Sequence, residues 1–310
     1  MRPKIFINIG LPKTSSTNLQ LNFYPYIKNI NYLGRSQSPW LNRQKKQSDL
    51  FKELNIFIEG GEKAKFTEER LEMLQKRFKN SLTHQINLIS MENWAFPYQK
   101  NTQTNKIEIV SQFEKLLRLK KFAKSLDVDY SFFLVHRDPA EAIISLFITA
   151  QNRIERVFGA EFLELKKLLH KYENKDEDYE NIKLFFDVYN IKKLKEIFFG
   201  SELKIFKYND IKIDPKKFID DFYKYLRLET DFSLLKNVIK KTGVTPTKNG
   251  NFFIKKPNFL FLLFKKLIPQ FILNKIKPLQ SFPFLKKLLV KDQIITQEEI
   301  RKLKKILAKE

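Results

Sequence analysis

The residue types best suited to bind an anion lie in the stretch IGLPKTSST at 9–17. The apolar run KIFINI at 4–9 precedes it and predicts a buried strand, and LQLNFY at 19–24 has the spacing of a helix. A strand that passes through a short loop into a helix leaves backbone N–H groups unpaired at the helix start, where the helix dipole adds positive potential. Because phosphate and sulfate groups are attracted to such a position, we expect the loop to cradle a dianion.

The side chains of this loop fit the same purpose. Gly10 allows a sharp exit from the strand, Pro12 stiffens the loop, and Lys13 adds a full positive charge. Four consecutive hydroxyl donors follow: Thr14, Ser15, Ser16 and Thr17. A simpler alternative is that the hydroxyls only cap a helix and that the lysine is solvated. The nucleotide loop G-x-x-x-x-G-K-[ST] is not present, since the lysine comes too early and the second glycine is missing, which disfavours an ordinary ATPase or kinase.

A second cationic residue, Arg137, lies within FFLVHRDPAEAIISLF at 132–147, directly after a run that predicts a strand. Ligands of open α/β sheets gather at the carboxyl ends of the strands, and a guanidinium group binds phosphate oxygens through two parallel hydrogen bonds. The alternative is a surface ion pair with Asp138 or Glu141. The position at a strand end favours a phosphate contact.

Glu92 is the strongest candidate for a general base. It follows the apolar strand INLISM at a second carboxyl end, and Ser90 in the same strand is placed to hydrogen-bond a ligand. We expect the three histidines to be structural: His170 lies among the charges of a predicted helix, His84 precedes a strand, and His136 lies on one.

Strands and helices alternate along most of the chain. The patterns predict helices at 67–82, 107–126, 138–154 and 214–228, and strands at 85–92, 129–136 and 203–210. Start signals accompany three helices: Pro139 in a first turn, Asp214 with Pro215, and the capping-box pair Thr296 and Glu299. Such alternation is typical of an α/β fold with a mainly parallel sheet flanked by helices.

Three segments together resemble the sulfotransferases that use 3′-phosphoadenosine 5′-phosphosulfate (PAPS). IGLPKTSSTNLQ at 9–20 looks like the 5′-phosphosulfate loop of that family, although Ser15 stands where glycine is usual. The segment 132–147 resembles the 3′-phosphate motif, with Arg137 and Ser145 in the places of its arginine and serine. KIFKYNDIKIDPKKFIDDFYKYLRL is similar to a later strand and helix of the family. The resemblance implies the P-loop NTPase-like sulfotransferase fold, of the carbohydrate or bacterial type.

The resemblance also implies a chemistry, the in-line transfer of a sulfuryl group from PAPS to a hydroxyl acceptor without a metal. The loop would hold the 5′-phosphosulfate, and Lys13 would stabilise the negative charge that grows on the leaving phosphate. Arg137 and Ser145 would hold the 3′-phosphate. Glu92 matches the glutamate that carbohydrate-type members use as a base, without the lysine that often follows it, and the alternative is a structural or acceptor-orienting role.

The composition favours an anionic partner. The net charge is +23 and the pI is about 9.8. Two alternatives to a sulfotransferase are a P-loop kinase that uses ATP and a non-catalytic protein that binds polyanions, although no recognisable helix-turn-helix or RNA-binding motif supports a nucleic-acid partner. Disulfides and thiolate metal sites are excluded because the sequence has no cysteine.

We expect a sulfotransferase domain at 1–250 and a basic, hydrophobic C-terminal segment with a closing helix at 251–310. The Phe/Leu/Ile clusters and Lys-Lys doublets of 251–290 fit either an anionic membrane surface or packing on the main domain. The membrane alternative favours a lipid-linked or carbohydrate acceptor. Lys248, in a glycine-containing loop, is a candidate for the adenine pocket. We expect a cytoplasmic protein, able to associate with the inner face of the membrane.

Overall fold

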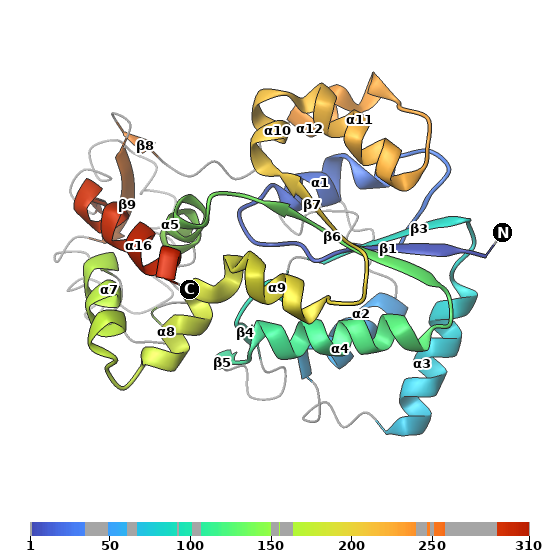
Figure 1. The fold of residues 1–310 in the computed structure, drawn as a ribbon, viewed down its shortest axis with the longest axis horizontal. Helices are drawn as coiled ribbons and strands as arrows, with labels where there is room; N and C mark the ends of the chain where they lie inside the picture. Colours follow the sequence, from blue (N-terminus) through green and yellow to red (C-terminus); the bar gives the residue numbers. More distant parts are fainter. Residues whose placement is uncertain are drawn as a thin grey trace, which may run out of the picture.

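The computed structural model describes residues 2–34, 49–60, 67–91, 93–100, 107–149, 155, 164–239, 247–248, 251–257 and 290–309 (Figure 1). Its centre is a five-stranded sheet with the strand order β2-β3-β1-β6-β7. The strands are β1 (Lys4–Asn8), β2 (Asn31–Tyr32), β3 (Ile86–Ser90), β6 (Asp129–His136) and β7 (Leu203–Lys207). Every neighbouring pair is parallel. The predicted α/β class with a parallel sheet is therefore confirmed.

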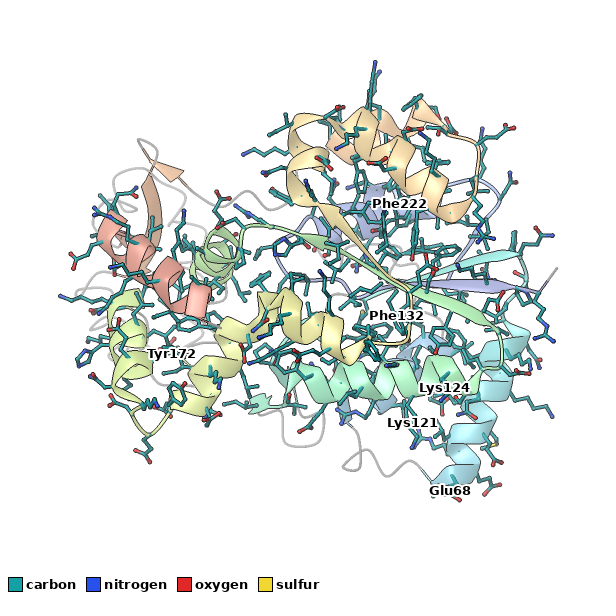
Figure 2. The ribbon with its side chains drawn as sticks, viewed as in Figure 1. Glu68, Lys121, Lys124, Phe132, Tyr172 and Phe222 are labelled. Carbon is teal, nitrogen blue, oxygen red and sulfur yellow. The ribbon has the colours of Figure 1, made fainter. Side chains whose placement is uncertain are left out.

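The sheet is buried on both faces because its strands are apolar at consecutive positions. On β6, Phe133 and Val135 belong to one hydrophobic cluster, whereas Phe132 and Leu134 belong to another. The first cluster is covered by α1 (Ser16–Asn22), α10 (Tyr208–Ile213), α11 (Pro215–Leu226) and α12 (Leu235–Ile239). Figure 2 shows Phe222 of α11 above the sheet and Phe132 below it.

The opposite face is covered by α2 (Asp49–Gly60), α3 (Glu68–Asn80), α4 (Gln112–Ser125) and α9 (Ile191–Ile197). Further helices lie beyond the carboxyl ends of the strands: α5 (Pro139–Thr149), α7 (Leu165–Asn174), α8 (Tyr179–Phe186) and α16 (Gln297–Lys309) (Figure 1). Short 3-10 turns connect several elements: η1 (Tyr24–Tyr26), η3 (Asn93–Ala95), η5 (Asp187–Tyr189) and η6 (Phe232–Leu234). Because helices cover both faces of the sheet, the carboxyl ends of its strands lead into loops and helix starts.

The predicted helix starts are confirmed. Pro139 is the first residue of α5, and Asp214 caps α11 by accepting a hydrogen bond from the Lys217 N–H group, with Pro215 in the first turn. Two predicted boundaries are wrong. Residues 107–109 form strand β5 (Ile107–Ile109), paired antiparallel with β4 (Tyr98–Lys100), before α4 begins, because their alternating apolar residues suit a strand. The strand predicted for 203–210 ends at Lys207, where α10 follows directly.

The described part of the C-terminal region joins the main fold. β9 (Asn251–Pro257) pairs antiparallel with β8 (Thr247–Lys248) and with β10 (Val290–Ile294). The predicted capping box of α16 is confirmed, since the Thr296 N–H group donates to Glu299 Oε2 at 2.7 Å and the Glu299 N–H group donates to Thr296 Oγ1 at 3.2 Å. Leu303 of α16 is buried in the cluster that contains β1 and β6. The membrane prediction falls mainly on 258–289, which lie outside the described residues.

Candidate active site

The loop after β1 has a backbone that turns three times through the left-handed region. Gly10, Lys13 and Ser15 have φ angles of 55°, 60° and 64°. The Gly10 N–H group donates to Asn8 Oδ1 at 2.9 Å, which fixes the exit from the strand. Left-handed residues within a turn bring successive backbone N–H groups toward a common point and form anion-binding concavities. The backbone therefore adopts a conformation suited to an anion, and Ser15 does so without the glycine that the resemblance leads one to expect.

The hydroxyl groups of Thr14 and Ser16 serve the loop itself. Both side chains are buried, and both donate to the Leu11 carbonyl oxygen at 2.7 Å. The two hydroxyl oxygens are 3.1 Å apart. Since a hydroxyl has one proton, neither has a second one to donate in this conformation. The role of these two hydroxyls as direct anion donors stays a prediction. In the structure they hold the loop closed by donating to the Leu11 carbonyl.

The next two carbonyls of the loop are also held by side chains of the protein. Tyr189 Oη donates to the Pro12 carbonyl at 2.5 Å, and Arg137 Nη1 donates to the Lys13 carbonyl at 3.3 Å. In a planar trans peptide the C=O and the following N–H point in opposite directions. The N–H groups of residues 13 and 14 therefore point away from the Tyr189 hydroxyl and the Arg137 guanidinium, respectively.

Arg137 is brought to the loop from 124 positions away in the sequence. Its side chain is 13% exposed, and its guanidinium lies 4.9 Å from the ring centre of Tyr208, the first residue of α10. The predicted ion pair is also present: Nε and Nη2 lie 3.3 Å and 3.2 Å from Glu141 Oε2. One edge of the guanidinium therefore contacts the loop and another contacts a half-exposed carboxylate, and the phosphate contact of Arg137 stays a prediction.

A buried polar network supports the loop from beneath. Asn8 Nδ2 donates to the hydroxyl oxygens of Tyr24 and Ser90 at 3.1 Å and 3.0 Å, and Gln20 Nε2 donates to Ser90 Oγ at 2.9 Å. Burial raises the pKa of Tyr24 well above its ordinary value, so its hydroxyl stays neutral. Ser90 therefore joins β1, β3 and α1, and its predicted contact with a ligand stays a prediction.

The structure describes some of the remaining predicted site residues and not others. Ser145 is buried on α5, about one turn after Glu141, and Thr17 lies in the first turn of α1. Glu92 lies outside the described residues, and the side chain of Lys248 is likewise not described. Their predicted roles are untested.

The three histidines have different surroundings. His84 and His170 are exposed, and each lies within hydrogen-bond distance of a neighbour in the chain: Thr83 at 3.0 Å and Asn174 at 2.9 Å. His136 ends β6, directly before Arg137, and its buried Nε2 has no hydrogen-bond partner among the residues that the structure describes. Burial lowers the pKa of His136 below its ordinary value, while the nearby Asp138 opposes the shift. Burial therefore favours the neutral form of the His136 imidazole.

Tyr189 and Tyr208 contact the site and were missed from the sequence. Tyr208 had a usable signal, because it directly follows β7 and so reaches the same carboxyl edge as Lys13 and Arg137. Tyr189 had none, because it lies in the short turn η5 between two helices, with no strand or motif to place it.

An ionisable side chain is also buried on α4. Lys115 on α4 is fully buried, and burial lowers its pKa to about 8, opposed by the charge of Glu59. Burial likewise raises the pKa of Glu59, opposed by Lys115. Among the described residues no group of three or more histidine, aspartate or glutamate side chains is placed to hold a metal ion. Over the same residues, none of the helices combines the length and the apolar character that crossing a bilayer requires.

No protein-family model matches this sequence, and no curated protein matches it. Solved structures do match. A sulfotransferase from Alicyclobacillus acidocaldarius is 16% identical over 77% of this chain and 96% of that one, with a TM-score of 0.42. The sulfotransferase domain from the curacin biosynthetic pathway is 13% identical over 81% and 82%, with a TM-score of 0.37. The sulfotransferase domain from the Synechococcus PCC 7002 olefin synthase is 14% identical over 78% and 80%, also with a TM-score of 0.37.

Proposed function

We propose that the protein transfers a sulfuryl group from PAPS to a hydroxyl acceptor. The observation that carries the proposal is the hydrogen bond from Arg137 to the Lys13 carbonyl, at 3.3 Å. It joins the two segments that the sequence analysis assigns to the 5′-phosphosulfate and the 3′-phosphate of one donor. A bisphosphorylated nucleotide needs two separate cationic contacts, whereas ATP needs a single loop for a continuous phosphate chain.

The residues of the loop would act by position and charge. Its N–H groups and the Lys13 ammonium would bind the 5′-phosphosulfate, and negative charge would grow on the phosphate oxygen as the bond to sulfur lengthens. Arg137 would bind the 3′-phosphate with the help of Ser145. Tyr208, which stacks on the guanidinium, would form one wall of the nucleotide site. The carbonyl anchors described above hold the loop in place before the donor arrives, so little ordering is needed on binding.

The proton of the acceptor hydroxyl needs a base, and Glu92 is our proposal for it. Strand β3 ends at Ser90, two residues before Glu92 in the sequence. This end lies at the edge of the sheet that also carries the loop and Arg137. We further propose a carbohydrate or glycolipid acceptor, handled in the cytoplasm or at the inner face of a membrane through 251–290. The net charge of +23 supports an anionic nucleotide and an anionic surface as partners.

The test is a calorimetric titration with adenosine 3′,5′-bisphosphate, ADP and AMP. The wild type is expected to prefer the bisphosphate, and Arg137→Ala is expected to lose about 10- to 150-fold in affinity, which corresponds to about 1.5–3 kcal/mol for a charged hydrogen bond. Lys13→Ala is also expected to lower the affinity for the bisphosphate. Arg77→Ala and Lys124→Ala serve as matched controls, since Arg77 pairs with Glu53 on α2 and Lys124 lies on α4, away from the loop (Figure 2). Equal affinity for the three nucleotides, or none for any, refutes the proposal.

A further inference from the structure

A cavity of about 240 Å³ lies beside the loop, on the face of the sheet opposite α1. Its lining combines two kinds of residue. The polar ones are His136, Asp187, Tyr189 and Asn190, and the apolar ones are Pro139, Phe186, Ile191 and Leu307. They come from the end of β6, the start of α5, the end of α8, η5, α9 and α16, which converge beyond the carboxyl edge (Figure 1).

Two lining residues connect the cavity directly to the cationic residues of the site. His136 precedes Arg137 in the chain, and the Tyr189 hydroxyl donates to the Pro12 carbonyl, next to Lys13. Arg137 itself contacts Tyr208 of α10, which covers the other face of the sheet. The cavity therefore lies next to the loop and to the end of β6 that leads into Arg137.

The polar groups of the lining suit hydroxyl groups. His136 Nε2 is buried without a partner, and a buried polar atom left unpaired is costly, so a ligand donor that reached it would gain affinity. Asp187 is 3% exposed, and Lys193 Nζ lies 2.5 Å from its Oδ2. Its Oδ1 receives a long 3.4 Å contact from Asn190, which a ligand hydroxyl can replace or join.

The apolar residues and the size of the cavity suit one ring. The C–H face of a hydroxylated ring packs on apolar side chains such as Phe186 and Leu307 while its hydroxyls meet the polar ones. The volume is below the range of about 300–1,000 Å³ that encloses a drug-sized ligand. The cavity is therefore matched to a single ring and not to a disaccharide.

We infer that this cavity binds the acceptor as a single hydroxylated ring, such as one sugar residue, with His136 Nε2 accepting a hydrogen bond from a ring hydroxyl. The inference rests on the proposed sulfotransferase function and adds the acceptor class and its position. It gives His136 a binding role and leaves the proton transfer to another group.

The experiment is histidine-labelled ¹⁵N NMR of the full chain saturated with adenosine 3′,5′-bisphosphate. Three histidines give three pairs of ring signals, and His136→Gln assigns the pair of interest. The probes are methyl β-D-glucopyranoside and myo-inositol, with tetrahydropyran as a ring that lacks hydroxyls. The hydroxylated rings are expected to shift the Nε2 signal of His136 saturably and to leave His84 and His170 unchanged, and tetrahydropyran is expected to shift none.

Two variants separate the cavity from a general effect on folding. Leu307→Trp fills the cavity from α16 and is expected to abolish the shift while the bisphosphate still binds. Lys304→Trp puts the same side chain on the exposed face of α16 and is expected to leave the shift intact. No His136 shift with either hydroxylated probe, or an equal shift in Leu307→Trp, overturns the inference. Failure of the wild type to bind the bisphosphate instead overturns the proposed function, so the two failures are distinguishable.

Discussion

Ser15 provides a sharp test of the loop, because it combines a strained backbone with a hydroxyl that the protein does not use as a cap. Its φ and ψ angles are 64° and 11°, and its side chain makes no capping hydrogen bond to α1. A left-handed conformation costs an L-residue about 1–2 kcal/mol that glycine does not pay. Ser15→Gly removes this strain and keeps the φ angle that the loop requires.

The net change in stability is small, since two effects partly cancel. Relief of strain adds about 1–2 kcal/mol, and the greater freedom of glycine in the unfolded chain removes about 0.4–1 kcal/mol; no capping hydrogen bond is lost because Ser15 makes none. The expected gain in the free energy of unfolding is therefore about 0.8 kcal/mol, or roughly 2–3 °C in Tm. Ser15→Val is the opposite change, and its β-branched side chain in the left-handed region is expected to lower the Tm by several degrees.

Binding separates the two possible roles of the Ser15 hydroxyl. If only the backbone of the loop binds the anion, Ser15→Gly and Ser15→Ala both keep the affinity for adenosine 3′,5′-bisphosphate, and the glycine variant gains because an anion can approach the backbone more closely. Calorimetry measures the affinity and differential scanning calorimetry the Tm. A loss of tenfold or more in both variants, with the Tm unchanged, would refute this reasoning and make the hydroxyl a ligand contact.

Three further changes test the surroundings of the loop. Glu141→Gln removes the carboxylate that competes for Arg137 and is expected to raise the affinity for the bisphosphate about twofold, which corresponds to the energy of an i,i+4 ion pair. A weaker affinity in calorimetry would contradict this and mean that the carboxylate orients the arginine. Tyr189→Phe leaves the Pro12 carbonyl without its donor and is expected to lower the free energy of unfolding in urea by about 1–3 kcal/mol; no change would contradict the contact. Burial lowers the pKa of Lys115 from 10.5 to about 8, so the unfolded chain binds more protons than the folded one between these pH values. The free energy of unfolding of the wild type is therefore expected to rise with pH across this window by on the order of 3 kcal/mol, and that of Lys115→Met is not. Equal pH slopes of the two proteins in urea unfolding would contradict this prediction.

The central fold was predictable because its signals are local. Each strand of the sheet's core is a short apolar run, and three of the predicted helices have a start marker, such as Asp214 with Pro215. The order of these elements then restricts the topology, since parallel strands joined by helices pack in few ways. The boundary at 107–109 was missed because three alternating residues before a long helical pattern carry too little signal against it.

The candidate site was predictable as far as it follows from strand ends. Lys13 and Arg137 each come just after a strand, and two parallel neighbours, β1 and β6, bring them to one edge. What the sequence could not supply is the direction of side chains. The hydroxyls of Thr14 and Ser16 look the same in a sequence whether they face a ligand or the Leu11 carbonyl, and only the left-handed turns of the folded loop decide between these.

The loop is held by donors that come from separate parts of the chain, and this bears on how it would work. The carbonyls of Leu11, Pro12 and Lys13 receive hydrogen bonds from the loop itself, from η5 and from the end of β6. A loop with its carbonyls turned inward presents its N–H groups outward without a ligand to arrange them, so an anion meets dipoles that are already oriented. The strained residues Lys13 and Ser15 persist because these contacts over-determine the backbone around them. The left-handed backbone of Lys13 and Ser15 and the hydrogen bonds to the three neighbouring carbonyls are therefore two aspects of the same arrangement.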